Sequence, residues 1–198
     1  MNYKPPPSEI IVKGKSYPIP TDFRVWLDLN EQFSNVSDKK ETLNVFISFL
    51  VKNKLPIFKE TIDKVLDFYN CGAKLKEENK SNQRKKEKYI DFKIDEELIF
   101  SAFISQYSID LRRDAVHWWD FMAMLSGLNE DHAISKIISY RAIDLKNVSK
   151  QSRDHYRKLK EKYSLKRKNH ITLEERDQIL LNRVKEIQKR VKDYSKQQ

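Results

Sequence analysis

Three side chains that could carry acid–base or metal chemistry stand close together in the middle of the chain. Asp110, Asp114 and His117 are spaced i, i+4, i+7, and a helix that runs unbroken through Arg113 would place them on one face. Two carboxylates beside an imidazole could transfer protons or bind a divalent metal. The same residues also suit structural roles, with Asp110 capping a turn, Asp114 near a helix N-terminus and His117 at a polar edge of the core. We favour the structural interpretation, because acidic residues are common at helix starts.

Other catalytic chemistry finds no support in the sequence. The three glycines, Gly14, Gly72 and Gly127, are too far apart to form a phosphate-binding loop. Cys71 is the single cysteine, which excludes an internal disulfide and a cysteine-rich zinc site, and the histidines never recur at ligand spacing. We therefore expect no catalytic residue, no metal and no cofactor, and so a protein that is not an enzyme.

Two adjacent tryptophans, Trp118 and Trp119, could form a platform for a base or a peptide. Neighbouring residues of a helix point about 100° apart, so only one of the two rings needs to be buried. We expect the pair to lie in the core and at its margin, as large rings usually do. Trp119 is kept as a candidate partner-binding residue.

The hydrophobic pattern that must position these residues predicts a mainly α-helical protein. We expect a multi-helix bundle with a short N-terminal β-hairpin turning at Gly14 and a long C-terminal helix. Thr21 is the expected N-cap of the first helix, and acidic Asp95 suits the start of a later one. The expected core-facing stripes are Leu43, Phe46, Ile47, Leu50 and Val51; Phe58, Ile62, Val65, Leu66 and Tyr69; Ile94, Leu98, Ile99, Ala102, Phe103 and Tyr107; and a helix over Arg112 to Leu128 with Trp118, Phe121, Met122 and Leu125 on one face.

Composition shifts divide the chain into four parts. Residues 1–72 should hold the hairpin and three helices, and residues 73–90 form a polar linker with almost no apolar periodicity. Residues 91–165 are expected to be a helical part of the same body. Residues 166–198 form a basic C-terminal helical extension.

Basic residues are concentrated near the C-terminus. The chain has 39 Lys and Arg against 29 Asp and Glu, a formal net charge of +10, and the whole excess falls in residues 146–198. Such a tail could be a solvated helix face, a protein-binding arm or, less favoured, a nucleic-acid contact. No apolar run approaches the roughly 20 residues needed to cross a bilayer, so we expect no membrane partner. The candidate basic surface is Arg153, Arg157, Lys160, Lys166, Arg167 and Lys168.

A narrow apolar seam follows the capping box Thr172 and Glu175. Its apolar residues follow one another at intervals of 7, 4, 3, 4 and 3 residues, which is typical of a helix that pairs with one other helix, in this chain or in another. Self-association through this helix is therefore one expectation. The candidate partner-binding residues are Leu173, Leu180, Val184, Ile187, Val191 and Tyr194, together with Trp119.

Four stretches resemble one known family in content and order. They are Gly14 to Leu27 (GKSYPIPTDFRVWL), Phe100 to Leu111 (FSAFISQYSIDL), His117 to Leu128 (HWWDFMAMLSGL) and Lys136 to Leu145 (KIISYRAIDL). In this order they resemble the bacteriophage Gp15 (gene product fifteen) family, over roughly residues 9 to 165.

The resemblance implies a tail-module protein of a long-tailed phage, encoded between the tail tube and tape measure proteins. It implies a tail assembly chaperone-like role, in which the tape measure protein is the expected partner among phage tail proteins. The expected location is the cytoplasm of the bacterial host during phage assembly, with incorporation into the virion left open. A structural tail component and a basic nucleic-acid-binding phage protein remain the alternatives.

Overall fold

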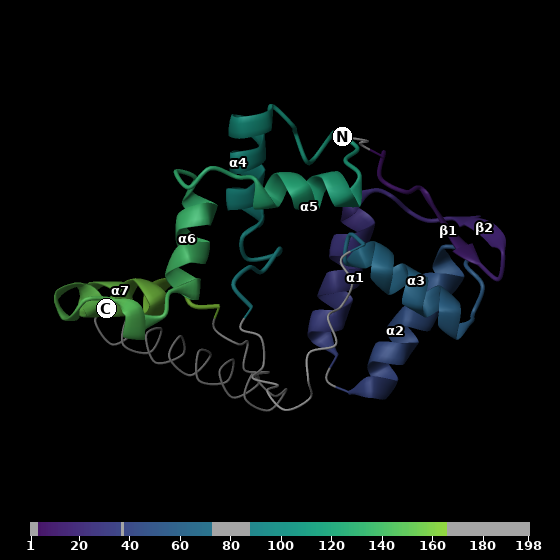
Figure 1. Ribbon diagram of the computed structural model, residues 1–198, viewed down its shortest axis with the longest axis horizontal. Coiled ribbons are helices and arrows are strands. Elements are labelled where there is room, and N and C mark those ends of the chain that lie inside the picture. Colours follow the sequence, from purple (N-terminus) through teal and green to yellow (C-terminus); the bar gives the residue numbers. More distant parts are fainter. Residues whose placement is uncertain (1–3, 37, 73–87, 166–198) are drawn as a thin grey trace, which may run out of the picture. The chain divides into compact units, whose positions relative to one another are not determined.

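The structure is a computed structural model that describes residues 4–36, 38–72 and 88–165 (Figure 1). It is mainly helical with a two-stranded antiparallel hairpin near the N-terminus, which confirms the predicted fold class. The predicted C-terminal helix and most of the predicted linker lie outside the described residues. Contacts divide the chain into two units, Met1–Tyr163 and Ser164–Gln198, and the helices and strands below belong to the first.

The α-helices of the described chain are nine to fourteen residues long. In chain order they are β1 (Glu9–Val12), β2 (Lys15–Pro18), α1 (Phe23–Asn35), α2 (Lys39–Lys52), α3 (Lys59–Tyr69), α4 (Glu96–Tyr107), α5 (Trp118–Ser126), α6 (Ala133–Ala142), the 3₁₀ turn η2 (Leu145–Asn147) and α7 (Lys150–Tyr163).

The hairpin turns at Lys13 and Gly14, as predicted. Both residues have positive φ, 50° and 74°, which is the conformation that a two-residue hairpin turn requires and that glycine adopts without strain. Ile10 and Val12 are buried, and the Lys13 ammonium lies 3.6 Å from the centre of the Phe58 ring at the start of α3. The hairpin therefore leans on α3, which compensates for the low stability of two strands alone.

The N-cap of α1 is Asp22, so the prediction of Thr21 was wrong by one residue. The Asp22 carboxylate accepts a hydrogen bond from the Arg24 amide. The Thr21 carbonyl instead accepts the Trp118 amide at 2.7 Å, and Asp22 forms an antiparallel bridge with His117. This pairing joins the residue before α1 to the residue before α5 and so aligns the two helix starts.

The predicted inward stripe of α2 was partly wrong. Phe46 and Leu50 are buried as expected, but Leu43 and Val51 are 48% and 61% exposed. Phe49, which the predicted stripe omitted, is buried against the Trp26 ring at 5.3 Å. The buried face of α2 is therefore centred on Phe46, Phe49 and Leu50. Burying the Phe49 ring removes more apolar area from water than burying Val51 would.

The predicted helix over Arg112 to Leu128 begins six residues late, at Trp118. The Asp110 carboxylate accepts the Arg112 amide, and the Asp114 carboxylate accepts the Asp110 amide. Side chains that bind nearby backbone amides compete with helix formation, so this segment forms a turn instead. Ile94 also departs from its predicted stripe, since it lies in the turn before α4 and is 57% exposed.

The core is rich in aromatic rings drawn from both halves of the described chain. Trp26 of α1 stacks on Phe68 of α3 at 4.9 Å and lies 6.3 Å from Trp118 of α5. Phe121 stacks on Phe23 at 4.7 Å, which adds a second contact between α5 and α1. Helices that precede and follow residues 73–87 thus share one hydrophobic core.

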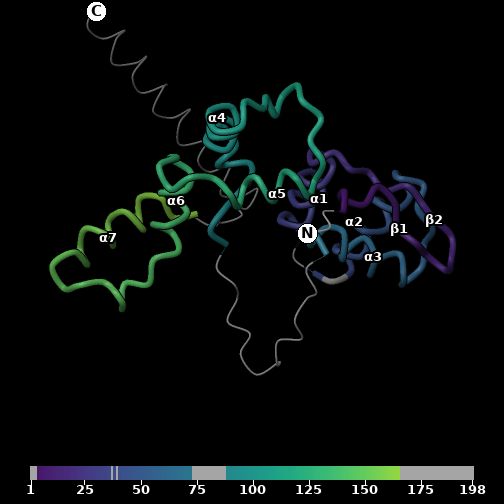
Figure 2. The backbone as a smooth tube through the Cα atoms, turned by 45° about the horizontal axis from the view of Figure 1, so that its top comes forward, coloured from purple at the N-terminus to yellow at the C-terminus, as the bar shows by residue number. Residues whose placement is uncertain are grey.

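The helices form a series of pairwise contacts. The hairpin contacts α3, and α1 contacts both α2 and α5, while α4 contacts both α5 and α6. Figure 2 shows α7 beside α6 and the hairpin beside α3. In the part of the chain that the structure describes, no helix is long and apolar enough to span a bilayer.

Candidate functional site

The structure does not bring Asp110, Asp114 and His117 together on a helix. Asp110 caps the turn that Asp114 closes, and His117 is the N-cap of α5. Asp110 therefore has the structural role that we favoured, whereas Asp114 belongs to this turn rather than to a helix N-terminus.

Both ring nitrogens of His117 have partners in the fold. Nδ1 accepts the Trp119 amide at 3.0 Å, and Nε2 lies 3.1 Å from the Pro7 carbonyl. Because Nδ1 accepts, the proton of the neutral ring belongs on Nε2, where it donates to Pro7. The imidazole is thus a capping group. Within residues 4–36, 38–72 and 88–165, no group of three or more His, Cys, Asp or Glu side chains could hold a metal ion.

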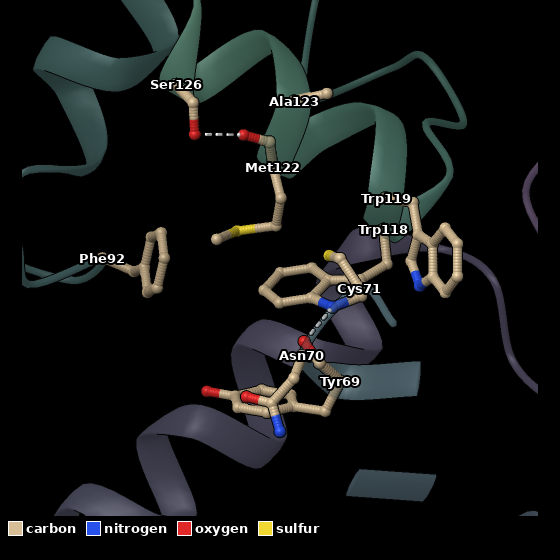
Figure 3. A pocket seen from close by; sticks show the side chains of 9 residues that line it. All are labelled: Tyr69, Asn70, Cys71, Phe92, Trp118, Trp119, Met122, Ala123 and Ser126. Atoms are coloured by element: carbon tan, nitrogen blue, oxygen red, sulfur yellow. Dashed lines mark hydrogen bonds between the residues drawn. The ribbon is translucent and has the colours of Figure 1, made fainter. Parts of the chain in front are cut away.

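A groove of about 550 Å³ lies between the end of α3 and one face of α5 (Figure 3). The α5 residues that line it are spaced along one side of the helix, and Phe92 faces them across the gap. Figure 3 shows the Met122 thioether reaching toward the space between Phe92 and the Trp118 indole. The full lining is Tyr69, Asn70, Cys71, Phe92, Trp118, Trp119, Met122, Ala123 and Ser126.

Both indole N–H donors beside the groove are already engaged. Trp118 Nε1 donates to the Tyr69 carbonyl at 2.9 Å, and Trp119 Nε1 donates to the Phe68 carbonyl at 2.8 Å. These bonds fasten α5 to the last turn of α3 and fix both rings. As a result, the tryptophans present carbon surface to the groove rather than hydrogen-bond donors.

The polar residues of the groove are engaged in the same way. The Asn70 amide donates to the Leu66 carbonyl at 2.8 Å, and the Ser126 hydroxyl donates to the Met122 carbonyl at 2.9 Å. With these donors bound internally, the groove suits an apolar side chain better than a polar small molecule, which needs free donors to orient it.

Gly72 closes α3 and fits against Trp119. Its φ is +71°, and a Cβ built there would lie 3.2 Å from the Trp119 ring. The preceding Cys71 also has positive φ, 54°, and the Gly72 amide donates to the Asp67 carbonyl at 2.8 Å. This helix ending, with left-handed residues at Cys71 and Gly72, turns the chain away and lets Trp119 pack closely.

Burial raises the pKa of two groove residues. It raises the pKa of the Cys71 thiol, and it raises the pKa of the Tyr69 phenol, to which the nearby Cys71 also contributes. Burial disfavours the charged form of each group, so both stay protonated at neutral pH.

Cys71 should react more slowly with a thiol reagent such as Ellman's reagent in the folded protein than in the unfolded chain. We expect a several-fold difference at pH 8, because the thiolate is the reactive form and the folded protein holds the proton more tightly. The stability that Cys71 contributes is present below its unfolded pKa and is lost as the pH rises through the folded pKa. Equal rates in buffer and in urea would contradict this prediction.

The predicted site residues lie in different places. Trp119 is half-buried at the edge of the groove, and Trp118 is 1% exposed, which confirms the expected pair of core and margin. Arg153, Arg157 and Lys160 lie on α7. The Arg153 guanidinium donates to the Val148 carbonyl and Lys160 donates to the Ile143 carbonyl, whereas Arg157 is exposed and pairs with Asp154 at 2.9 Å.

The remaining predicted site residues lie outside the described residues. They are Lys166, Arg167, Lys168, Leu173, Leu180, Val184, Ile187, Val191 and Tyr194. Their roles stay predictions.

The groove itself was not predicted. Its residues come from three segments, 69–71, 92 and 118–126, which no periodic pattern connects. The usable signal was the α5 spacing of Trp119, Met122, Ala123 and Ser126, which is a helical stripe that shares Met122 with the predicted core stripe.

Comparison with known proteins identifies the family. Residues 7–165 match the family model described as Bacteriophage Gp15 protein, which covers most of the chain. The chain belongs to the bacteriophage Gp15 family. Neither the curated proteins nor the solved structures contain a match. Membership of the Gp15 family indicates a phage structural or morphogenesis protein, and the family is not known for an enzymatic activity.

Proposed function

We propose that this Gp15-family chain is a non-enzymatic tail morphogenesis factor that acts like a tail assembly chaperone. It binds the tape measure protein through helix–helix contacts and keeps it soluble before the tail tube assembles. Membership of a phage structural or morphogenesis family supports a role in phage assembly. The resemblance to tail-module proteins suggests the partner.

The observation that carries the proposal is the groove between α3 and α5. Amphipathic helices bind by placing apolar side chains into grooves of this kind, and the flexible methionine thioether adapts to side chains of different shape. Met122, Phe92 and the two tryptophans supply such a lining, and the nearby donors are engaged within the fold. A tape measure helix with an apolar stripe would bury that stripe here.

The exposed basic side chains of α7 support a second, weaker contribution to partner binding. Arg157 is 53% exposed, and Lys158 and Lys162 are also exposed. Such charges steer an acidic segment toward the chain and lose their effect as salt screens them. The apolar C-terminal seam, outside the described residues, is proposed as a further contact to the tape measure protein or to a second copy of this chain.

Co-expression with the tape measure protein of the same phage tests the proposal. We expect the tape measure protein to become soluble and to co-purify with the wild-type chain. Ala123→Glu should abolish co-purification, since Ala123 is exposed and lines the groove, so that a carboxylate there would have to be desolvated by the bound helix.

Ala133→Glu is the matched control, because Ala133 is an exposed alanine on α6 that does not line the groove. It should leave co-purification unchanged, and circular dichroism should show both variants folded. A bound partner should also slow alkylation of Cys71, which lies in the groove. If the two variants bind equally well, the groove is not the binding site. If the wild-type chain leaves the tape measure protein insoluble, the chaperone role is wrong.

Two further measurements separate the alternatives. A structural tail component would be found in purified virions, whereas a chaperone would be absent from them. A nucleic-acid-binding protein would retain nucleic acid with an affinity that falls steeply as salt is added.

A further inference from the structure

The packing of α7 is separate from the hydrophobic core. No residue of α7 is buried, and within the described residues none of its apolar side chains belongs to the core cluster. Tyr156, Leu159 and Tyr163 are half-buried, and the Tyr163 ring stacks on Tyr140 of α6 with centres 5.8 Å apart. These side chains form a small satellite cluster rather than an extension of the core.

Polar bonds join the start of α7 to the preceding η2 turn and its end to α6. Near its start, the Arg153 guanidinium donates to the Val148 carbonyl at 3.1 Å. Near its end, the Lys160 ammonium donates to the Ile143 carbonyl at 2.9 Å, and Arg141 Nε donates to the Tyr163 carbonyl at 2.6 Å. The Arg141 bond joins a buried residue of α6 to the last residue of α7.

The other partners of Arg141 lie outside α7. Nη1 and Nη2 donate to the two carboxylate oxygens of Asp95 at 2.7 and 2.9 Å, and Nη1 also donates to the Tyr89 carbonyl at 3.0 Å. The Arg141 and Asp95 side chains are only 7% and 2% exposed. Departure of α7 would therefore break one hydrogen bond of the guanidinium without leaving an unpaired buried charge.

The closed position of α7 also contains an unsatisfied donor. Arg153 Nε is buried and has no acceptor in the described part of the chain. An unpaired buried donor destabilises the state that contains it. Release of α7 into water would satisfy this group, which favours opening.

We propose that Arg141 is a latch, and that α7 opens from α6 as a cooperative unit while the core stays folded. Local opening of this kind is expected where an element buries little apolar surface and is held by a few polar bonds. Opening would uncover Tyr140 on α6 together with the inner side of α7. A ligand with higher affinity for the open state than for the closed one would shift the population toward it. This device goes beyond the groove and does not depend on the proposed function.

Hydrogen exchange of the full chain, followed by mass spectrometry, tests the latch. Arg141→Lys keeps a positive charge opposite Asp95 but removes the Nε donor to Tyr163 and the bidentate geometry of the Asp95 pair. We expect amides of residues 150–163 to exchange at least about tenfold faster, as loss of one charged hydrogen bond implies, and by a larger factor than the amides of α1 and α5. Arg157→Lys makes the same substitution at an exposed ion pair on α7 itself and should change exchange by less than about twofold.

Tyr163→Ala provides a second variant that leaves the Arg141 and Asp95 side chains intact. It removes the stack on Tyr140 and should also accelerate exchange in residues 150–163 alone. If this variant accelerates exchange equally in α7, α1 and α5, then α7 unfolds only with the whole body and the latch is wrong. Exchange in α7 of the wild-type chain as slow as in α1 would also overturn it.

Discussion

Asp95→Ala should lower the free energy of unfolding by about 3–5 kcal/mol, because it leaves the buried Arg141 charge without a counter-ion. The two side chains form a bidentate pair at 2.7 and 2.9 Å, and both are nearly inaccessible to water. The two carbonyls that remain, those of Tyr89 and Tyr163, carry only partial charge and cannot replace a carboxylate. The Asp91 amide, which donates to Asp95 at 2.9 Å, would lose its acceptor as well. Urea denaturation followed by circular dichroism measures the loss.

Glu97→Ala is the control for this prediction. Glu97 pairs with Arg112 at 2.9 Å, but the two side chains are 77% and 58% exposed. An exposed pair contributes less than about 1 kcal/mol, so the unfolding midpoint should barely move. Equal shifts of the midpoint in Asp95→Ala and Glu97→Ala would show that the burial of the Asp95 pair has no energetic consequence.

The Asp95–Arg141 pair could not be predicted from the sequence. Asp95 precedes Glu96 and Glu97, and all three looked like acidic residues at a helix start. Only Glu96 and Glu97 lie in the first turn of α4, whereas Asp95 turns inward to a partner 46 residues away. Local spacing contains no information about a partner at that separation.

Short stretches of sequence predicted the features that depend on neighbouring residues alone. The hairpin turn at Gly14 was predicted because such a turn requires positive φ, which glycine adopts without strain. The late start of α5 was missed because a helical spacing of Asp110 and Asp114 does not reveal that their carboxylates bind the backbone of the turn.

The groove depends on contacts that no single segment specifies. Trp119 of α5 meets the carbonyl of Phe68, 51 residues earlier, and Phe92 comes from a third segment. The sequence identified Trp119 as a candidate from its residue type and its neighbour. It could not identify Cys71 or Phe92 as groove residues, because their position depends on how α3 and α5 pack.

Trp118→Ala should destabilise the protein by about 3–5 kcal/mol, as expected for truncation of a fully buried aromatic side chain. The Trp118 ring stacks on Tyr69 at 5.6 Å and on Phe121 at 5.9 Å, and lies 6.3 Å from Trp26. The substitution would leave a cavity between α1, α3 and α5 and would leave the Tyr69 carbonyl without its indole donor. Thermal or urea unfolding followed by far-UV circular dichroism measures the loss.

Trp119→Ala separates folding from binding at the neighbouring position. Trp119 is only half-buried, so its loss should destabilise by a smaller amount, about 1–2 kcal/mol. Because its ring forms one end of the groove, we expect this variant to remain folded and to lose co-purification with the tape measure protein. If instead Trp119→Ala unfolds the chain as readily as Trp118→Ala, the ring belongs energetically to the core. If it stays folded and binds as the wild type does, the partner does not reach this end of the groove.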